Sequence, residues 1–247
     1  MLEDTQELYH GLTYPWGRTV VPSPGRPEKI ADGVYWARFP MPMSLDHINI
    51  WLLEDEDGWT VVDTCLGMNS AKEIWEQMFA GFMQNRPIVR VICTHLHPDH
   101  VGLAGWLIER FGCELWMSRE EFLMCRNMAG DTGRPAPEVA LRFYRAAGYN
   151  EEQLERYKKK FGNFGRAISA LPDSFRRLVD RETITIEAIP VTKPMATYSI
   201  ILISLTRIPD NFAACGFAPI KYICFPTLVK LKTNQYISST KIKTSIG

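Results

Sequence analysis

This sequence lacks both an excess of charge and a long apolar segment. Its 28 Lys and Arg balance its 28 Asp and Glu, so it carries no basic footprint for nucleic acid or an anionic membrane. The longest mainly apolar run, Tyr198–Leu205, is far too short to span a bilayer. Residues Met1–Asp4 are acidic and no apolar core follows them, so no signal peptide is expected. We therefore expect a globular protein that acts on a small molecule and binds neither nucleic acid nor membrane.

Closely spaced cysteine pairs are also absent. The six cysteines form no CxxC pair and are scattered along the chain: Cys65, Cys93, Cys113, Cys125, Cys215 and Cys224. With 247 residues, 46% of them hydrophobic, the chain can bury a large core and needs no disulfide scaffold. We expect free core thiols in a reducing compartment, and the cytoplasm is the expected location.

Histidine, tryptophan and acidic residues almost disappear from the final part of the chain. All five His and all seven Trp precede residue 189, and Asp210 is the only acidic residue after residue 188. The tail is rich in Ile, Ser, Thr and Lys, and Tyr236–Gly247 shows no helical or strand period. We predict that residues 189–247 are an atypical tail, disordered or non-native, as a frameshift, mis-splicing or a wrong gene model would produce. A genuine divergent domain is the alternative.

Residues 29–188 alternate between strand and helix patterns, whereas residues 1–28 contain Gly and Pro without a period and predict an irregular arm. Strands are predicted at Gly33–Pro40, His47–Glu54, Trp59–Asp63, Ile88–Cys93, Glu114–Met117 and Thr183–Glu187. Helices are predicted at residues 70–83, at Val101–Arg110, from Ser118 to about Met128, and, within a polar insertion at residues 137–168, at Pro137–Ala147 and Glu151–Phe161. This order predicts an α/β (α+β) fold with early hairpins.

Short local signals set the expected ends of these elements. Asp55-Glu56-Asp57-Gly58 predicts a hairpin turn between two strands. Ser70-x-x-Glu73 and Ser118-x-x-Glu121 each have the spacing of a capping box, which predicts that a helix begins there. Gly112 suits the left-handed position that ends a helix.

The most informative stretch is Thr94-His95-Leu96-His97-Pro98-Asp99-His100, in which four of the last six residues are potential metal ligands. Alternate side chains of an extended segment point to one side, so His95 and His97 can face the same ion. Pro98 turns the chain out of the strand, which brings Asp99 and His100 to a neighbouring point for a second ion. Nitrogen and oxygen donors suit zinc-type ions, and two such ions can share a hydroxide that attacks a carbonyl or phosphoryl group. The alternative is a helix start that carries two solvent-facing histidines.

This motif resembles the HxHxDH signature of the metallo-β-lactamase-fold hydrolases, a superfamily that includes glyoxalase II-like enzymes. The resemblance implies a four-layer αβ/βα sandwich, with residues 29–188 as its well-formed first half, and a site for one or two zinc ions. It also implies a third His, a bridging Asp and a last His from the second half of the chain. No histidine follows His100, so those ligands are absent. We therefore expect metal binding and activity to be impaired in this chain.

Val61-Val62-Asp63-Thr64 resembles the early motif of the same superfamily, in which an Asp supports the metal ligands by hydrogen bonds. A strand-end Asp that satisfies a turn is the alternative reading of Asp63. Cys65 stands where the family usually has glycine. By analogy with the family, the insertion at residues 137–168 is expected to form a lid over the site.

Three other polar residues are expected to have structural or surface roles. His47 precedes a strand and His10 lies in the N-terminal arm, and a single histidine is more often structural than functional. Thr94 is expected to end its strand rather than act as a nucleophile, because no base with an orienting partner accompanies it.

If the resemblance holds, His95 and His97 hold one metal, Asp99 and His100 hold a second, and a bridging hydroxide attacks an ester, thioester or lactam. Asp99 could also accept the proton released as the tetrahedral intermediate collapses. A non-haem iron oxidoreductase is an alternative, because imidazole and carboxylate suit iron as well as zinc. A nuclease is disfavoured by the neutral charge, and a non-catalytic, truncated remnant is favoured by the missing ligands. The sequence carries no indication of oligomeric state.

Overall fold

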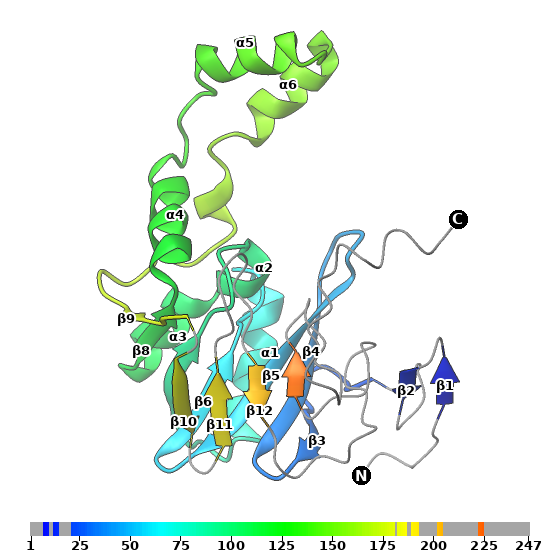
Figure 1. Ribbon diagram of the computed structural model, residues 1–247, viewed down its shortest axis with the longest axis vertical. Coiled ribbons are helices and arrows are strands. Elements are labelled where there is room, and N and C mark those ends of the chain that lie inside the picture. Colours follow the sequence, from blue (N-terminus) through cyan, green and yellow to red (C-terminus); the bar gives the residue numbers. More distant parts are fainter. Residues whose placement is uncertain are drawn as a thin grey trace.

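A seven-stranded mixed sheet forms the centre of the structure, a computed structural model that describes residues 7–9, 12–14, 21–180, 182–186, 189–192, 202–204 and 222–224 (Figure 1). Its strands run in chain order from edge to edge: β3 (Glu28–Ala31), β4 (Val34–Pro40), β5 (His47–Asp55), β6 (Gly58–Val62), β7 (Ile88–Ile92), β8 (Glu114–Met117) and β9 (Arg176–Arg177). Pairing is antiparallel from β3 to β6 and parallel from β6 to β9. The α/β fold class and the early hairpins predicted from the sequence are confirmed.

The turn between β5 and β6 shows how local sequence and packing agree. Asp55 pairs with Gly58 at the end of the ladder, as the turn signal predicts. A Cβ atom on Gly58 would lie 2.2 Å from the carbonyl oxygen of Pro87, so only glycine fits against the segment that enters β7.

The helices follow the strands in the expected order. They are α1 (Asn69–Ala80), α2 (Pro98–Val101), α3 (Ala104–Phe111), α4 (Arg119–Gly130), α5 (Glu138–Ala146) and α6 (Glu151–Lys160), followed by a 3-10 turn, η1 (Phe164–Arg166). Gly112 ends α3 with a φ of 66°, in the left-handed region that glycine adopts without strain. Among the described residues, no helix is long and apolar enough to cross a membrane.

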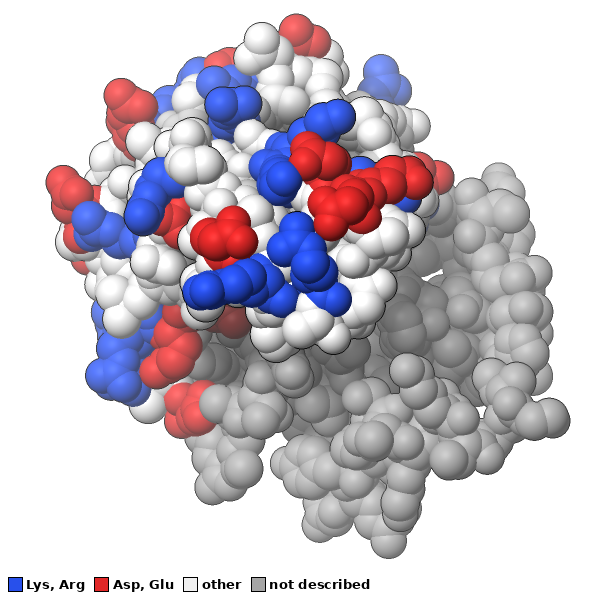
Figure 2. Space-filling view, turned by 90° about the horizontal axis from the view of Figure 1, so that it is seen from above, with Lys and Arg blue, Asp and Glu red and all other residues white. Residues whose placement is uncertain are grey.

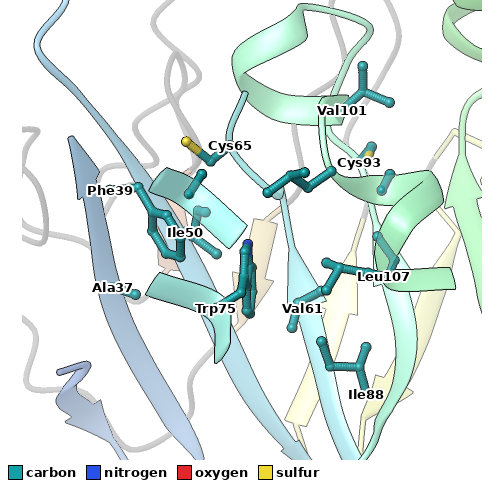
Figure 3. Close-up of a cluster of buried hydrophobic side chains, with 14 of the residues drawn as sticks. Ala37, Phe39, Ile50, Val61, Cys65, Trp75, Ile88, Cys93, Val101 and Leu107 are labelled. Carbon is teal, nitrogen blue, oxygen red and sulfur yellow. The ribbon is translucent and has the colours of Figure 1, made fainter. Parts of the chain in front are cut away.

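Helices α1 and α3 cover one face of the main sheet, and the core lies between this face and the two helices (Figure 3). Trp75 of α1 is fully buried, and its ring centroid lies 5.3 Å from that of Phe39 on β4. Its indole Nε1 donates a hydrogen bond to the carbonyl of Thr64 at 3.1 Å, so the polar edge of this large side chain is satisfied. Leu107 of α3 packs in the same cluster, next to Ile88 and Val61 of the sheet.

The opposite face packs against a second sheet. Trp36, Trp51 and Leu53 form a cluster there with Ile184 and Ile186. The last two belong to β10 (Thr183–Ile186), which pairs antiparallel with β11 (Ile189–Thr192) and, beyond it, β12 (Leu202–Ser204) and β13 (Tyr222–Cys224). These three segments, which the sequence did not predict as strands, complete an antiparallel sheet with the predicted strand β10. Strands of three or four residues, as these are, carry too little periodicity to be found in the sequence. The expectation that residues 189–247 are an atypical, disordered or non-native tail stays a prediction. Asp210 and Tyr236–Gly247 lie outside the described residues.

The predicted irregular arm also needs correction. Residues Glu7–Tyr9 (β1) and Leu12–Tyr14 (β2) form a two-stranded antiparallel hairpin, and β3 begins at Glu28, inside the predicted arm. Strands of three or four residues are shorter than the window in which a period can be recognised. His10 lies outside the described residues.

The insertion forms two helices as predicted, but they do not lie over the sheet. Figure 1 shows α5 and α6 packed on each other beyond the far end of α4, away from both sheets. A capping box of Asn150 and Gln153, which was not predicted, starts α6. The helix pair therefore projects from the body, and its role as a lid stays a prediction.

The two predicted capping boxes have different outcomes. At α4, the Ser118 side chain accepts a hydrogen bond from the backbone N–H of Glu121, as expected. At α1, the helix begins at Asn69 after Met68, and no side chain caps it. Ser70 thus lies inside the first turn, because the helix starts two residues earlier than a cap at Ser70 would place it.

Candidate metal centre

The predicted metal motif lies at the end of β7, where the parallel strands of the sheet terminate. Residues Thr94–His97 leave the strand, and Pro98 opens the short helix α2. A proline at the first helical position loses no hydrogen bond and has a suitable φ, which explains why the chain turns at this residue. The motif is thus divided between a loop and a helix start.

Three imidazole rings come together at this point. The ring centroid of His95 lies 4.6 Å from that of His97 and 4.0 Å from that of His100. The carboxylate of Asp99 lies 3.3 Å from Nε2 of His100. The four sequence-predicted ligands are therefore neighbours, and His95 and His97 do not point to opposite faces of the sheet.

Asp63 is the centre of the hydrogen-bond network beneath these rings. Its side chain is buried, and its Oδ1 accepts a bond from the backbone N–H of Thr94 at 2.8 Å. The Thr94 hydroxyl lies 3.0 and 2.9 Å from its two oxygens, and Nδ1 of His100 donates to Oδ2 at 2.8 Å. The predicted contact of Asp63 with the motif loop is present; its role toward a metal stays a prediction.

The backbone around Asp63 is strained. Asp63 and Cys65 have φ angles of 65° and 74°, in the left-handed region that disfavours residues with a side chain. The position of Cys65 is the one at which the resemblance implies glycine, and its φ explains that preference. Burial raises the pKa of its thiol to about 12, so Cys65 is present as a neutral thiol.

Electrostatics give the two inner imidazoles opposite properties. Burial lowers the pKa of His95 to about 4, and the positive charge of His100 acts in the same direction, so the ring is neutral near pH 7. Burial also disfavours the charged form of His100. However, the charge and hydrogen bond of Asp63, together with Asp99, outweigh that effect and raise its pKa to about 10. Burial tends to raise the pKa of Asp99, but its hydrogen bond with His100 and the charge of that ring lower it.

The chemistry of these donors fits a divalent metal that prefers nitrogen and oxygen. His95 offers a neutral imidazole, and a carboxylate that orients a histidine ligand through its other ring nitrogen, as Asp63 does for His100, is usual at metal sites. The distances between these side chains do not yet form a metal site. In the part of the chain that the structure describes, no group of three or more His, Cys, Asp and Glu has the geometry to hold a metal ion. Asp99 and His100 are bonded to each other instead.

Glu121 supports the motif loop and was not identified from the sequence as a site residue. Its carboxylate Oε2 accepts a hydrogen bond from the backbone N–H of Leu96, between His95 and His97, at 2.8 Å. The sequence motif assigned this carboxylate to the cap of α4, where only the Ser118 half of the box forms. Spacing alone gives no signal that Glu121 reaches a loop 25 residues away.

The helix start is held from the other side by the segment that returns from α6. The hydroxyl and the N–H of Ser169 both donate to the carbonyl of Gly102, at 2.9 and 2.6 Å. A Cβ atom on Gly102 would lie 2.4 Å from the Pro98 carbonyl oxygen and 2.5 Å from that of Cys65. Glycine is therefore required where α2, the Asp63 loop and the return segment meet.

The remaining histidine that the structure describes lies apart from this cluster. His47 starts β5, and its Nδ1 lies 2.5 Å from the carboxylate of its neighbour Asp46, at the surface. This arrangement agrees with the structural or surface role expected from the sequence. Cys65, Cys93, Cys113 and Cys125 are free thiols, as expected from the sequence.

Comparisons with known proteins agree with this architecture. The sequence model of the metallo-beta-lactamase superfamily matches residues 43–157, which include the whole motif. A beta-lactamase domain protein from Burkholderia ambifaria is 32% identical, with a TM-score of 0.65, over 79% of this chain and 59% of that one. A metallo-beta-lactamase family protein from Thermus thermophilus, 23% identical with a TM-score of 0.56, matches over 71% of this chain and 56% of its own, and it shows the fold alone.

A curated relative matches a shorter stretch. A linear primary-alkylsulfatase from a Pseudomonas species is 31% identical over 74 residues, which are 30% of this chain and 10% of that protein. The chain thus spans a small part of this relative and less than two thirds of either solved structure. The HxHxDH motif, the sheet that presents it and the match to the sequence model agree: residues 43–157 are similar to the metallo-β-lactamase superfamily, and the chain has the α/β fold of its solved relatives.

Proposed function

We propose that this site is that of a metal-dependent, zinc-type hydrolase that acts on an ester, thioester or lactam, and that its activity is impaired in this chain. The observation that carries the proposal is the cluster of His95, His97 and His100 with Asp99 at the end of β7, supported from below by Asp63. The match of residues 43–157 to the metallo-beta-lactamase superfamily model supports hydrolysis as the reaction class; the reaction, the substrate and the metal are part of the proposal.

The residues have distinct roles under this proposal. His95 and His97 would hold one ion, and Asp99 and His100 a second; such an ion lowers the pKa of bound water to about 7 and so supplies a nucleophile. Asp99 is a half-buried carboxylate with a lowered pKa, so it is ionised near pH 7 and its Oδ2 can accept a proton. Asp63 keeps the ring of His100 oriented throughout.

Impairment is proposed because the ligand set is short. A catalytic zinc usually has three protein ligands, whereas the motif offers two per ion. No histidine follows His100 in the sequence. We therefore expect sub-stoichiometric zinc in the purified protein.

The charge distribution on one described face favours a small-molecule substrate over a nucleic acid (Figure 2). Figure 2 shows the molecule from the α5–α6 end, where Lys and Arg are interspersed with Asp and Glu rather than collected in a basic patch. Local ion pairs such as Arg156–Glu152 and Lys158–Glu155 explain this mixture. A nucleic-acid substrate would need a basic stripe. We also propose a cytoplasmic location, on the basis of the free thiols.

The test combines elemental analysis with a substrate panel. Zinc and iron per chain are measured after purification and after loading, for the parent chain and for His97→Ala. Turnover is measured on a thioester, a lactone, a lactam and, because of the alkylsulfatase relative, a primary alkyl sulfate. We expect weak zinc binding that His97→Ala abolishes, and turnover near background. Stoichiometric zinc with turnover that depends on His97 would overturn the impairment, whereas metal content equal in both chains would overturn the metal site. Iron as the retained metal would favour the non-haem iron oxidoreductase, since the donors suit it equally.

A further inference from the structure

Thr94 makes more polar contacts in the site than a strand-end threonine needs. Its hydroxyl oxygen lies 3.0 and 2.9 Å from the two oxygens of Asp63, and 2.9 Å from Nδ1 of His95. It is fully buried, so no water competes for these contacts. The one hydroxyl group thus lies between a carboxylate that orients His100 and the first imidazole of the motif.

The hydrogen atoms in this network can be assigned by counting donors. A threonine hydroxyl has a single hydrogen, and a carboxylate has only acceptors. If that hydrogen pointed to His95, the Thr94 hydroxyl oxygen would face the carboxylate oxygens of Asp63 at 2.9–3.0 Å with no hydrogen between them. The hydroxyl therefore donates to Asp63, and its lone pair accepts from Nδ1 of His95.

We infer that Thr94 is a positioning residue that fixes the tautomer of His95. Its hydroxyl donates its hydrogen to Asp63 and presents a lone pair to His95, so that the neutral ring carries its hydrogen on Nδ1. We call this arrangement the relay. The free lone pair then lies on Nε2 of His95. His100 is oriented by the same carboxylate through its own Nδ1, which donates directly to Asp63 at 2.8 Å. One buried carboxylate thus sets the ring nitrogens of two histidines, one directly and one through Thr94.

This assignment rests on the proposed function only in its consequence for metal binding. The tautomer belongs to the metal-free protein, and it follows from contacts among Asp63, Thr94 and His95 alone. With a metal, a ring whose Nε2 lone pair is already exposed binds without first moving a proton.

The test reads the tautomer directly in the metal-free protein. Selective nitrogen-15 labelling of histidine distinguishes a protonated from an unprotonated Nδ1 by its chemical shift, in the parent chain, in Thr94→Val and in Thr94→Ser. We expect Nδ1–H on His95 in the parent chain and in Thr94→Ser, which retains a hydroxyl. Thr94→Val preserves the shape and the backbone bond from residue 94 to Asp63 but removes the relay, so we expect its His95 to shift toward the Nε2–H form.

A second measurement is zinc affinity, which we expect to fall about 10-fold in Thr94→Val and to recover in Thr94→Ser. Nε2–H on His95 of the parent chain would overturn the relay even if Thr94→Val fails to fold. An unchanged tautomer in a folded Thr94→Val would also overturn it. If neither the parent chain nor the variants bind zinc while the tautomer behaves as expected, the proposed function fails and the relay stands.

Discussion

Two buried aspartates flank β6 and have different partners. Asp55, just before the strand, accepts a bond from the hydroxyl of Thr60 at 2.7 Å and lies 3.6 Å from the guanidinium of Arg90. Asp63, just after it, is shared by Thr94 and His100. Each carboxylate thus has a threonine and a cation.

The difference lies in the kind of cation and in the surroundings. A guanidinium stays charged over the whole range in which proteins fold, so the Asp55 end is an electrostatic tie of fixed strength. An imidazolium can lose its proton, and His100 is almost fully buried, so the strength of the Asp63 end depends on pH. An aspartate therefore forms an ion pair that does not change with pH at one end of β6, and a hydrogen-bond network whose charge depends on pH at the other.

The largest expected effect is the loss of the carboxylate at the site end. Asp63→Ala leaves a buried imidazolium and the N–H of Thr94 without an acceptor, so we expect a loss of about 3–5 kcal/mol of unfolding free energy. Asp55→Ala, whose partner Arg90 retains some contact with water, should lose about 1–3 kcal/mol. Urea unfolding at pH 7 measures both. Equal losses would show that the two ends do not differ as described.

The second prediction concerns pH. The folded pKa of His100, about 10, is above its ordinary value of 6.5, so its stabilisation is complete below pH 6.5 and is lost as pH rises toward 10. The folded pKa of His95, about 4, is below 6.5, so the unfolded chain takes up its proton first and stability falls from pH 6.5 toward 4. Metal-free protein should therefore be most stable near pH 6.5.

Each pKa unit corresponds to roughly 1.4 kcal/mol, so the loss on the alkaline side should reach a few kcal/mol. Chemical unfolding between about pH 4 and about pH 9.5 measures the profile. His100→Gln is the control and should flatten the alkaline side alone. An alkaline slope that persists in this variant would assign the effect to other groups.

The third comparison is between two side chains that bond to backbone groups, which we call clamps: Glu121 at the site end of β6 and Arg86 at the opposite end. Glu121→Ala removes the acceptor for the Leu96 N–H and should destabilise the protein by about 1–2 kcal/mol, with faster hydrogen exchange at Leu96. Glu121→Gln retains an acceptor oxygen and should recover most of the protection. At the far end, Arg86 donates to the carbonyls of Asp55 and Gly58. Arg86→Ala should leave exchange at Leu96 unchanged; faster exchange there would mean that the clamps are not independent.

The smallest expected effect comes from the threonine at the Asp55 end. Thr60→Val removes one buried hydrogen bond to Asp55 and should lose about 1 kcal/mol of stability by thermal or urea unfolding. It should not alter the His95 ring, since Thr60 bonds to the aspartate at the other end of β6. A changed His95 tautomer in this variant would mean that the tautomer responds to a general loosening of the sheet, and not specifically to the loss of the Thr94 hydroxyl.

Much of the fold was predictable because its signals are local. The hairpin before Gly58, the end of α3 at Gly112 and the strand Glu114–Met117 each depend on residues whose own backbone preferences indicate the structure. The rest of the second sheet, beyond the predicted strand β10, was not predictable in the same way, since β11 to β13 are short and depend on pairing between distant segments.

The sequence by itself determined which chemistry is present: three imidazoles and a carboxylate in one short motif, and no histidine after it. The tertiary structure decided which atoms they offer. Asp99 pairs with His100, and Glu121 accepts from the Leu96 amide instead of capping its own helix. Asp63 bonds to His100 directly and to Thr94, which in turn contacts His95. A side chain with several acceptor atoms bonds to whatever long-range packing brings near it, and the spacing of residues along the chain does not contain that information.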